Sequence, residues 1–384
     1  SPRSIADAAR RMSSSTPSVS ASAGSRARAP SRSPASARIS ASWRRSGRAR
    51  ALPPRASAQA VSVSSASSGT PASQLRLGYF ANVTHSTAIA EVANGTLAKD
   101  LGSTKLSTSI FNAGPAEMTA LLSGQLDAAY VGPSSALSAW TKSDKQGLTI
   151  IAGAETGGAE LVVDSSITSA SQLKGKTIAS PQLGNTQDVA LRYWLKQQGY
   201  STTLQGSGDV TIQPEANATT LSLFKQGKIQ GAWVPEPWAS RLVLEGNGHV
   251  LVDEKSLWPN GQFATTNLVV NTSFLQAHPQ TVAQLLDAQI ATNKWILANP
   301  AAAQSLISGA IKKLTGSTIT DAEIQRAWTE ESVTNDPLTA SLSTSLSHAV
   351  SDGLLKSTSL DGIFDLTLLN QELAKAGESA VPTS

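Results

Sequence analysis

Cysteine is absent from this chain, and methionine occurs only twice in 384 residues. A chain without cysteine forms no disulfide, has no thiolate nucleophile, offers no cysteine ligands to zinc and carries no lipid-modified cysteine at its N-terminus. Long hydrophobic runs are missing too, since no stretch approaches the roughly 20 apolar residues of a membrane-spanning helix. The four histidines show no spacing typical of a metal site. We therefore expect neither a metal nor a cofactor.

Acidic residues are nearly absent from the N-terminal segment. Residues 1–73 contain 12 Arg, no Lys and the single acid Asp7, a net charge of 12 − 1 = +11. The whole chain is +4, so residues 74–384 carry 4 − 11 = −7. The basic character belongs to this segment alone and does not indicate nucleic-acid binding by the remainder.

The segment 1–73 is dominated by Ser, Ala, Arg and Pro, so it cannot bury enough apolar surface to offset chain entropy. We expect it to be disordered. It has the composition of an organellar transit peptide, of a damaged or misread secretory leader, or of a nonspecific basic arm. Residues 56–58 and 58–60 look like small-residue cleavage sites, but residues 48–55 before them are not an apolar core. The second interpretation is favoured, because the rest of the chain has the pattern of an exported protein.

From Gln74 onward, strands alternate with helical runs, a pattern typical of βαβ units around parallel sheets. A second such series begins at Lys176, and after a strand at Gln262–Val270 the chain is almost entirely helical. The order predicts two lobes joined by crossovers near Val163–Ser166 and Trp258–Gln262. Residues 74–165 with 258–384 would form a discontinuous first lobe, and residues 166–257 the second.

Two Gly-Pro turns organise the first lobe. Gly114-Pro115 and Gly132-Pro133 each stand between the end of a strand and the start of a helix. Proline suits the first helical position, and glycine, which has no side chain, leaves the backbone accessible to a ligand. Two helix N-termini would thus open at the carboxyl edge of one sheet, where α/β proteins bind ligands and anions are favoured. The hydroxyls of Ser134 and Ser135 would add donors. The alternative is a plain strand-to-helix connection, with Asn112 as a helix cap.

Further candidates come from both lobes. Asn185, Thr186 and Gln187 open a helix of the second lobe. Asn185 or Thr186 is a good N-cap, which is the plain alternative, while Thr186 and Gln187 can also donate to an anion. Asn82, Thr84 and His85 follow the first strand. His85 has a neutral donor and can be charged below about pH 6.5, and an ordinary, satisfied surface or core histidine is the alternative.

Two further segments could contribute to the same site. Gly157 and Gly158 precede a strand and predict either a wall near the hinge or a simple Gly-rich hairpin. In Val234–Trp238, Glu236 would bind a cationic or hydroxyl tail of the ligand, or form a salt bridge with Arg241 at the rim of the binding site. Trp238 would be a pocket wall or a packing aromatic. No nucleophile–base constellation is visible, which favours capture over catalysis.

Five strings resemble one family in the same order: Leu77–His85, Asn112–Glu117, Leu126–Pro133, Pro181–Asp188 and Gly231–Trp238. From about Gln74 to its end, the chain is similar to the substrate-binding proteins of ABC importers for aliphatic sulfonates, nitrate, taurine and bicarbonate. The resemblance implies an α/β, two-lobed periplasmic-binding-protein fold of type II (venus flytrap) with a helical C-terminal segment.

The resemblance also implies a monomeric, exported binding protein that captures a small anion, with an aliphatic sulfonate favoured, and delivers it to an ABC permease. A nitrate, bicarbonate or thiamine-precursor (pyrimidine) binding protein is the alternative. An enzyme similar to the pyrimidine synthase of fungal thiamine biosynthesis is a more distant one. That enzyme uses a pyridoxal-phosphate lysine and a cysteine-rich motif, so the absence of cysteine counts against it.

Overall fold

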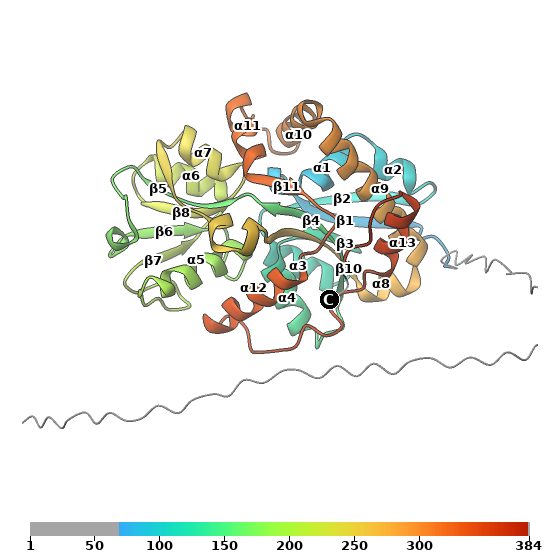
Figure 1. Cartoon of the computed structure of the whole chain (residues 1–384), viewed down its shortest axis with the longest axis horizontal. Coiled ribbons are helices and arrows are strands. Elements are labelled where there is room, and N and C mark those ends of the chain that lie inside the picture. The colour runs from blue at the N-terminus through green and yellow to red at the C-terminus, as the bar shows by residue number, and fades with distance from the viewer. Residues whose placement is uncertain (1–68, 383–384) are drawn as a thin grey trace, which may run out of the picture. The chain divides into compact units, whose positions relative to one another are not determined.

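The computed structural model describes residues 69–382, so most of the predicted leader, residues 1–73, lies outside the described part (Figure 1). The strands of the first sheet are β1 Gln74–Phe80, β2 Lys105–Phe111, β3 Ala128–Val131, β4 Leu148–Gly157, β10 Ala264–Asn271 and β11 Glu331–Val333. Those of the second are β5 Ala159–Asp164, β6 Thr177–Ser180, β7 Thr211–Pro214, β8 Gly231–Pro235 and β9 Gly248–Asp253.

The α-helices are α1 Ser86–Ala93, α2 Thr96–Asp100, α3 Gly114–Leu122, α4 Pro133–Lys142, α5 Thr186–Gln197, α6 Asn217–Lys225, α7 Trp238–Leu244, α8 Thr272–Ala277, α9 Pro279–Ala298, α10 Pro300–Thr315, α11 Asp321–Glu330, α12 Thr339–Ser351 and α13 Thr367–Lys375. Within residues 69–382, no helix has both the length and the apolar composition that crossing a bilayer requires. Gly95, which adopts a φ of 79°, separates α1 from α2.

The two sheets are mixed rather than parallel. Their strand orders are β11-β4-β10-β3-β1-β2 and β7-β6-β8-β5-β9. In the first, β1 pairs in parallel with β2 and β3, but β10 runs antiparallel to β3 and β4. In the second, β6 pairs in parallel with β7 and β8, while β5 is antiparallel to β8 and β9. The predicted βαβ units are therefore present, each extended by antiparallel strands.

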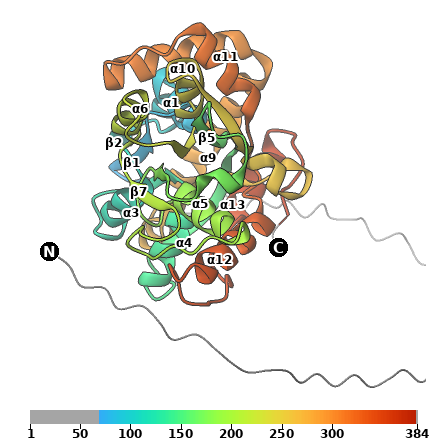
Figure 2. The same cartoon turned by 90° about the vertical axis from the view of Figure 1, so that its left-hand side faces the viewer.

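Helices cover both faces of the second sheet, as Figure 1 shows for α5 on one side and α6 and α7 on the other. Side chains alternate across a strand. On β8, Trp233 packs toward α5, where Leu191 and Leu195 lie. Its neighbour Val234 packs instead with Phe224 of α6 and with α7. The first sheet is covered likewise, by α1, α9 and α10 on one face and α3, α4 and α12 on the other (Figure 2).

The first crossover lies earlier than predicted. Strand β5 belongs to the second sheet, so the chain changes sheets at Gly157 and Gly158, not at Val163–Ser166. Both glycines have positive φ, 81° and 72°, and this left-handed backbone redirects the chain. The return passes between β9 and β10, and this connection contains the predicted Trp258–Gln262.

The helical C-terminal segment touches both lobes. Helix α12 packs against α4 of the first lobe and α5 of the second. Helix α11 packs against α7, and β11, which follows it, pairs with β4. The segment therefore belongs to the first lobe through β11 and also contacts helices of the second lobe.

Candidate ligand-binding cleft

The two sheets share one local arrangement. In each, the strand next to one edge, β1 or β6, lies between the next two strands of the chain, so the winding direction reverses beside it. Ligands of α/β sheets bind at such a switch point, outside the carboxyl ends of the strands. Phe80 and Gly132 mark these ends in the first sheet, and Pro181 and Pro235 in the second. All four line one cavity, so the two switch points face each other.

Four helices begin at this cavity. Residues of the first turns or N-caps of α3, α4, α5 and α6 line it: Gly114, Gly132, Asn185, Thr186 and Asn217. Helix N-termini carry free N–H groups and the positive end of the macrodipole. Within the described residues, no side chain caps α3, α4 or α6, whereas Asn185 caps α5 by accepting from the amide of Asp188. Three of these N-termini thus keep their amides available to an anion.

Asn112 lines the cavity but does not cap α3. The N-cap position is occupied by Ala113, in extended conformation. The predicted role of Asn112 as a helix cap is therefore wrong.

Three buried hydroxyls lie at these helix starts without a hydrogen-bond partner among the described residues. They are the side chains of Ser134, Ser135 and Thr186, which are 2%, 2% and 7% exposed. A buried polar group without a partner costs about 1–3 kcal/mol. An acceptor placed between the lobes would relieve that cost. A Cβ added to Gly132 would collide with the Thr186 hydroxyl, so the absence of a side chain at Gly132 lets the lobes approach this closely.

His85 is neutral in this environment. Its Nδ1 accepts from the amide of Phe80 at 3.4 Å, and its ring lies 4.2 Å from the Phe80 ring, centroid to centroid. Burial lowers the pKa of His85 to about 3. The possibility that His85 is charged just below pH 6.5 is therefore wrong, and the alternative of a satisfied, buried histidine agrees with the structure. The ring lines the cavity as a neutral imidazole with its proton on Nε2.

The nearby acids do not present a free carboxylate to the cavity. Glu117, in the first turn of α3, is fully buried, and burial raises its pKa well above its ordinary value. Asp188, in the first turn of α5, is paired with Arg192 at 2.8 Å and accepts from the Ser180 hydroxyl at 2.6 Å. The lining residues include no Lys or Arg. Neutral donors and helix dipoles thus dominate the cavity, which suits an anion of low charge.

Most of the residues predicted for the site come together here. Nine line the cavity: Asn82, Thr84, His85, Gly114, Gly132, Ser135, Asn185, Thr186 and Gln187. Pro115 and Ser134 line an adjacent cavity, which Ser135 also borders. Gly157, Gly158, Glu236 and Trp238 line neither. The two glycines instead form the first crossover, where the carbonyl of Gly157 accepts from Thr265.

Glu236 has a different partner from the one predicted. It is fully buried and accepts from Arg326 at 2.7 Å and from the amide of Ser240 at 3.0 Å. Arg241, its predicted partner, donates to the carbonyl of Thr318 at 2.9 Å. Burial and the neighbouring Glu160 raise the pKa of Glu236 to about 7, against the effect of Arg326. A buried, paired carboxyl of this kind does not receive the tail of a ligand.

The sequence did not single out several lining residues: Phe80, Pro181, Asn217, Pro235, Thr265 and Thr266. Asn217 begins a helix shortly after a strand, as Gly114 does. The argument from strand-to-helix turns that selected Gly114 could therefore have selected Asn217 as well. Thr265 and Thr266 come from β10, whose antiparallel return to the centre of the sheet has no local sequence signal.

The lobes are closed on the cavity. Its volume is about 20 Å³, room for about one water molecule. Trp238 of the second lobe donates to Asn82 of the first at 2.9 Å, and Lys196 of α5 donates to the carbonyl of Ser351 in α12 at 2.6 Å. A larger guest needs the lobes to separate before it enters.

Comparison with known proteins places this architecture in a family. The profile of the NMT1-like family matches residues 68–310, which is more than half of the chain. The chain is a member of the NMT1-like family. A relative of this chain is the taurine-binding periplasmic protein of Escherichia coli strain K12, which is 28% identical over 215 residues. That alignment covers 54% of this chain and 62% of the relative, so the chain spans less than two thirds of its length.

Solved structures confirm the fold of this NMT1-like protein. The alkanesulfonate-binding protein SsuA of Xanthomonas axonopodis pv. citri, bound to MOPS, matches with a TM-score of 0.62 at 20% identity. That match covers 75% of this chain and 96% of SsuA. The periplasmic nitrate-binding protein NrtA of Synechocystis PCC 6803 matches with a TM-score of 0.66 at 16% identity, over 82% of this chain and 92% of NrtA. The predicted resemblance and the two-lobed type II binding-protein fold are thereby confirmed.

Proposed function

We propose that this protein is an exported solute-binding protein of an ABC importer that captures a small organic anion, with a sulfonate headgroup, and presents it to a membrane permease. The observation that carries the proposal is the convergence of four helix N-termini on one cavity between two lobes, together with the buried hydroxyls of Ser135 and Thr186, which have no partner among the described residues. A third such hydroxyl, of Ser134, lies in the adjacent cavity that Ser135 also lines. The names of the taurine-binding and alkanesulfonate-binding relatives support the choice of headgroup.

The donor set fits a sulfonate. Its three oxygens carry a single charge spread over a tetrahedral centre, which matches several neutral donors arriving from different directions better than one cationic side chain would. Each bond to a charged acceptor contributes about 1.5–3 kcal/mol before association costs. Three or four such bonds are sufficient for micromolar affinity, about −8 kcal/mol.

The mechanism is capture by closure. In an open form, the first lobe offers Ser134, Ser135 and the N-termini of α3 and α4. Rotation about the crossovers at Gly157–Gly158 and between β9 and β10 then brings Thr186 and the N-terminus of α6 over the anion. The ligand stabilises the closed form because the donors of both lobes contact it only there. A permease would recognise that closed form.

A screen of thermal unfolding tests the proposal. The purified chain is heated with methanesulfonate, taurine, nitrate, bicarbonate or a thiamine-precursor pyrimidine. A ligand at 100 times its Kd adds about 2.7 kcal/mol to the free energy of unfolding. We expect stabilisation by sulfonates and little by the pyrimidine. Stabilisation by the pyrimidine alone would overturn the proposal in favour of a thiamine-precursor binding protein.

The enzyme alternative has a separate test. Reconstitution with pyridoxal phosphate would produce an absorbance band near 400 nm if a lysine formed a Schiff base with it. We expect no such band, because neither Lys nor Arg lines the cleft cavity.

A further inference from the structure

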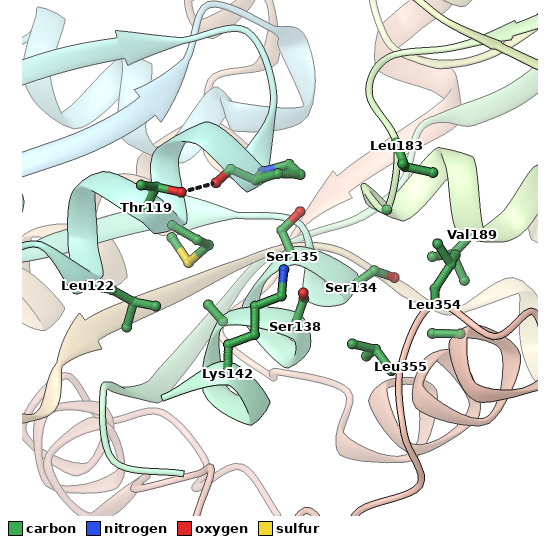
Figure 3. A pocket seen from close by; sticks show the side chains of 15 residues that line it. Thr119, Leu122, Ser134, Ser135, Ser138, Lys142, Leu183, Val189, Leu354 and Leu355 are labelled. Atoms are coloured by element: carbon green, nitrogen blue, oxygen red, sulfur yellow. Dashed lines mark hydrogen bonds between the residues drawn. The ribbon is translucent and has the colours of Figure 1, made fainter. Parts of the chain in front are cut away.

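A second, larger cavity adjoins the cleft. Its volume is about 270 Å³, and α3, α4, the turn before α5, and the C-terminal segment around α12 enclose it (Figure 3). Pockets for small organic molecules begin at about 300 Å³, so this space has room for several carbon atoms, whereas the cleft cavity holds about one water.

The two cavities meet at the helix starts. Ser135 lines both, and successive residues of two turns divide between them: Gly114 and Pro115, and Asn185 and Gly184. The unpartnered hydroxyls of Ser134 and Ser135 lie at this border. A headgroup bound by the helix starts would therefore have its substituent directed toward the larger cavity.

The larger cavity is mainly apolar and has one charged side chain. Its apolar lining includes Met118, Leu122, Leu183, Val189, Leu354 and Leu355. Lys142 is the charged residue among those that line it, and no carboxylate does. In Figure 3, the ammonium of Lys142 points toward the end of α4 that carries Ser135. Methylene groups would be buried here, but a cationic substituent would face Lys142 with no counter-charge.

We propose, on the basis of the function proposed above, that this cavity holds an uncharged apolar tail of the ligand, so that the protein selects alkyl sulfonates of about four to six carbons over taurine. The head remains between the helix starts, and the tail lies against Met118, Leu122 and Leu355. Lys142 adds attraction for the anionic head and rejects an ammonium tail. The selectivity would thus differ from that in the name of the taurine-binding relative.

Isothermal titration calorimetry with a homologous series tests the proposal on the full chain. The ligands are methane-, propane-, butane- and hexanesulfonate, together with taurine, in which an ammonium replaces the terminal methyl of propanesulfonate. Burial of a methylene contributes about 0.8 kcal/mol, so Kd is expected to fall by about fourfold for each added carbon until the cavity is full. Taurine is expected to bind at least tenfold more weakly than propanesulfonate. Equal affinities along the series, or tighter binding of taurine, would overturn the proposal.

Two variants locate the tail. Ser138→Leu fills the cavity from α4 and is expected to weaken hexanesulfonate at least tenfold while changing methanesulfonate less than twofold. Ser347→Leu, at an exposed position of α12, is the matched control and should change neither. Lys142→Glu is expected to lower the Kd ratio of taurine to propanesulfonate at least fivefold. An unchanged hexanesulfonate affinity in Ser138→Leu would place the tail elsewhere.

The outcomes separate the two proposals. If no sulfonate binds the wild-type chain, the proposed function fails. If methanesulfonate binds but longer chains gain nothing, the cleft proposal stands and the tail proposal fails.

Discussion

Trp238 donates its indole N–H to Oδ1 of Asn82 at 2.9 Å, and this bond joins the second lobe to the first beside the cleft. The two residues are 156 positions apart in the chain. Trp238 was predicted to be either a pocket wall or a packing aromatic. In the structure its side chain forms a hydrogen bond between the lobes. Arg241 lies over its ring, 4.8 Å from the centroid, and holds it in place.

Replacing Trp238 with phenylalanine should therefore weaken ligand binding without unfolding the protein. The variant loses one hydrogen bond of the closed form, about 0.5–1.5 kcal/mol, or about a two- to twelvefold rise in Kd. Calorimetry with butanesulfonate measures it. Trp295→Phe, in α9 away from the cleft, is the matched control and should bind normally. Unchanged affinity in Trp238→Phe would mean that this bond does not contribute to closure.

Thr186→Val should separate binding from stability. The substitution keeps the shape of the side chain and removes a buried hydroxyl that has no partner in residues 69–382. The free energy of unfolding without ligand should stay the same or rise, while Kd rises about tenfold or more, since a bond to a charged group is worth about 1.5–3 kcal/mol. Thr292→Val removes a similarly buried, unpartnered hydroxyl in α9 and is the control. Equal effects of the two variants on Kd would contradict the assignment of Thr186 to the ligand.

Acid should destabilise the protein through His85. Burial lowers the pKa of His85 to about 3, whereas the unfolded chain takes up this proton near pH 6.5. Between these values the unfolded state binds more protons, so stability falls as the pH falls below about 6.5. Relative to His85→Gln, the wild type should lose up to about 1.4 kcal/mol per pH unit. Other buried groups, such as Glu155 with a pKa raised by burial to about 8, titrate in both proteins and cancel.

Urea unfolding from pH 7.5 to 4.5 without ligand measures this difference. His278→Gln, at a partly exposed position outside the cleft, serves as the control and should run parallel to the wild type. A constant difference in stability between wild type and His85→Gln at all pH values would show that His85 is protonated in the folded state as readily as in the unfolded one.

Arg326 should matter for stability more than any surface charge. It donates to Glu160 at 2.6 Å and to Glu236 at 2.7 Å, and both carboxyl groups are buried. Arg326→Met leaves two buried acids without their cation, which should cost about 2–3 kcal/mol, somewhat less than the 3–5 kcal/mol of a fully buried pair. Lys225→Met, which breaks an exposed pair with Glu245, should cost at most about 1 kcal/mol. Urea unfolding at pH 8 compares them, and equal losses would contradict a supporting role for Arg326.

Much of the fold could be predicted because its signals are local. Strand ends followed by Gly-Pro or by Asn185-Thr186 marked three of the four helix starts at the cleft before their positions in space were known. The same logic applies to Asn217 after β7, where it was not used. The strand predicted at Gln262–Val270 agrees closely with β10, Ala264–Asn271.

What failed depends on contacts between distant segments. β4 and β5 are both apolar strands, and only their partners, β10 and β8, decide which sheet each joins. The crossover was therefore placed after β5 instead of before it. The alternatives for Glu236 were a ligand tail or its sequence neighbour Arg241, whereas its actual partner, Arg326, lies 90 residues away.

A crystal structure of the chain with butanesulfonate would test the central claim most directly. We expect the sulfonate sulfur between Gly132 and Thr186, with its oxygens within hydrogen-bond distance of the Ser134, Ser135 or Thr186 hydroxyls and of amides at the start of α3 or α4. A sulfonate bound outside these helix starts, with Ser135 and Thr186 making no contact to it, would contradict the account.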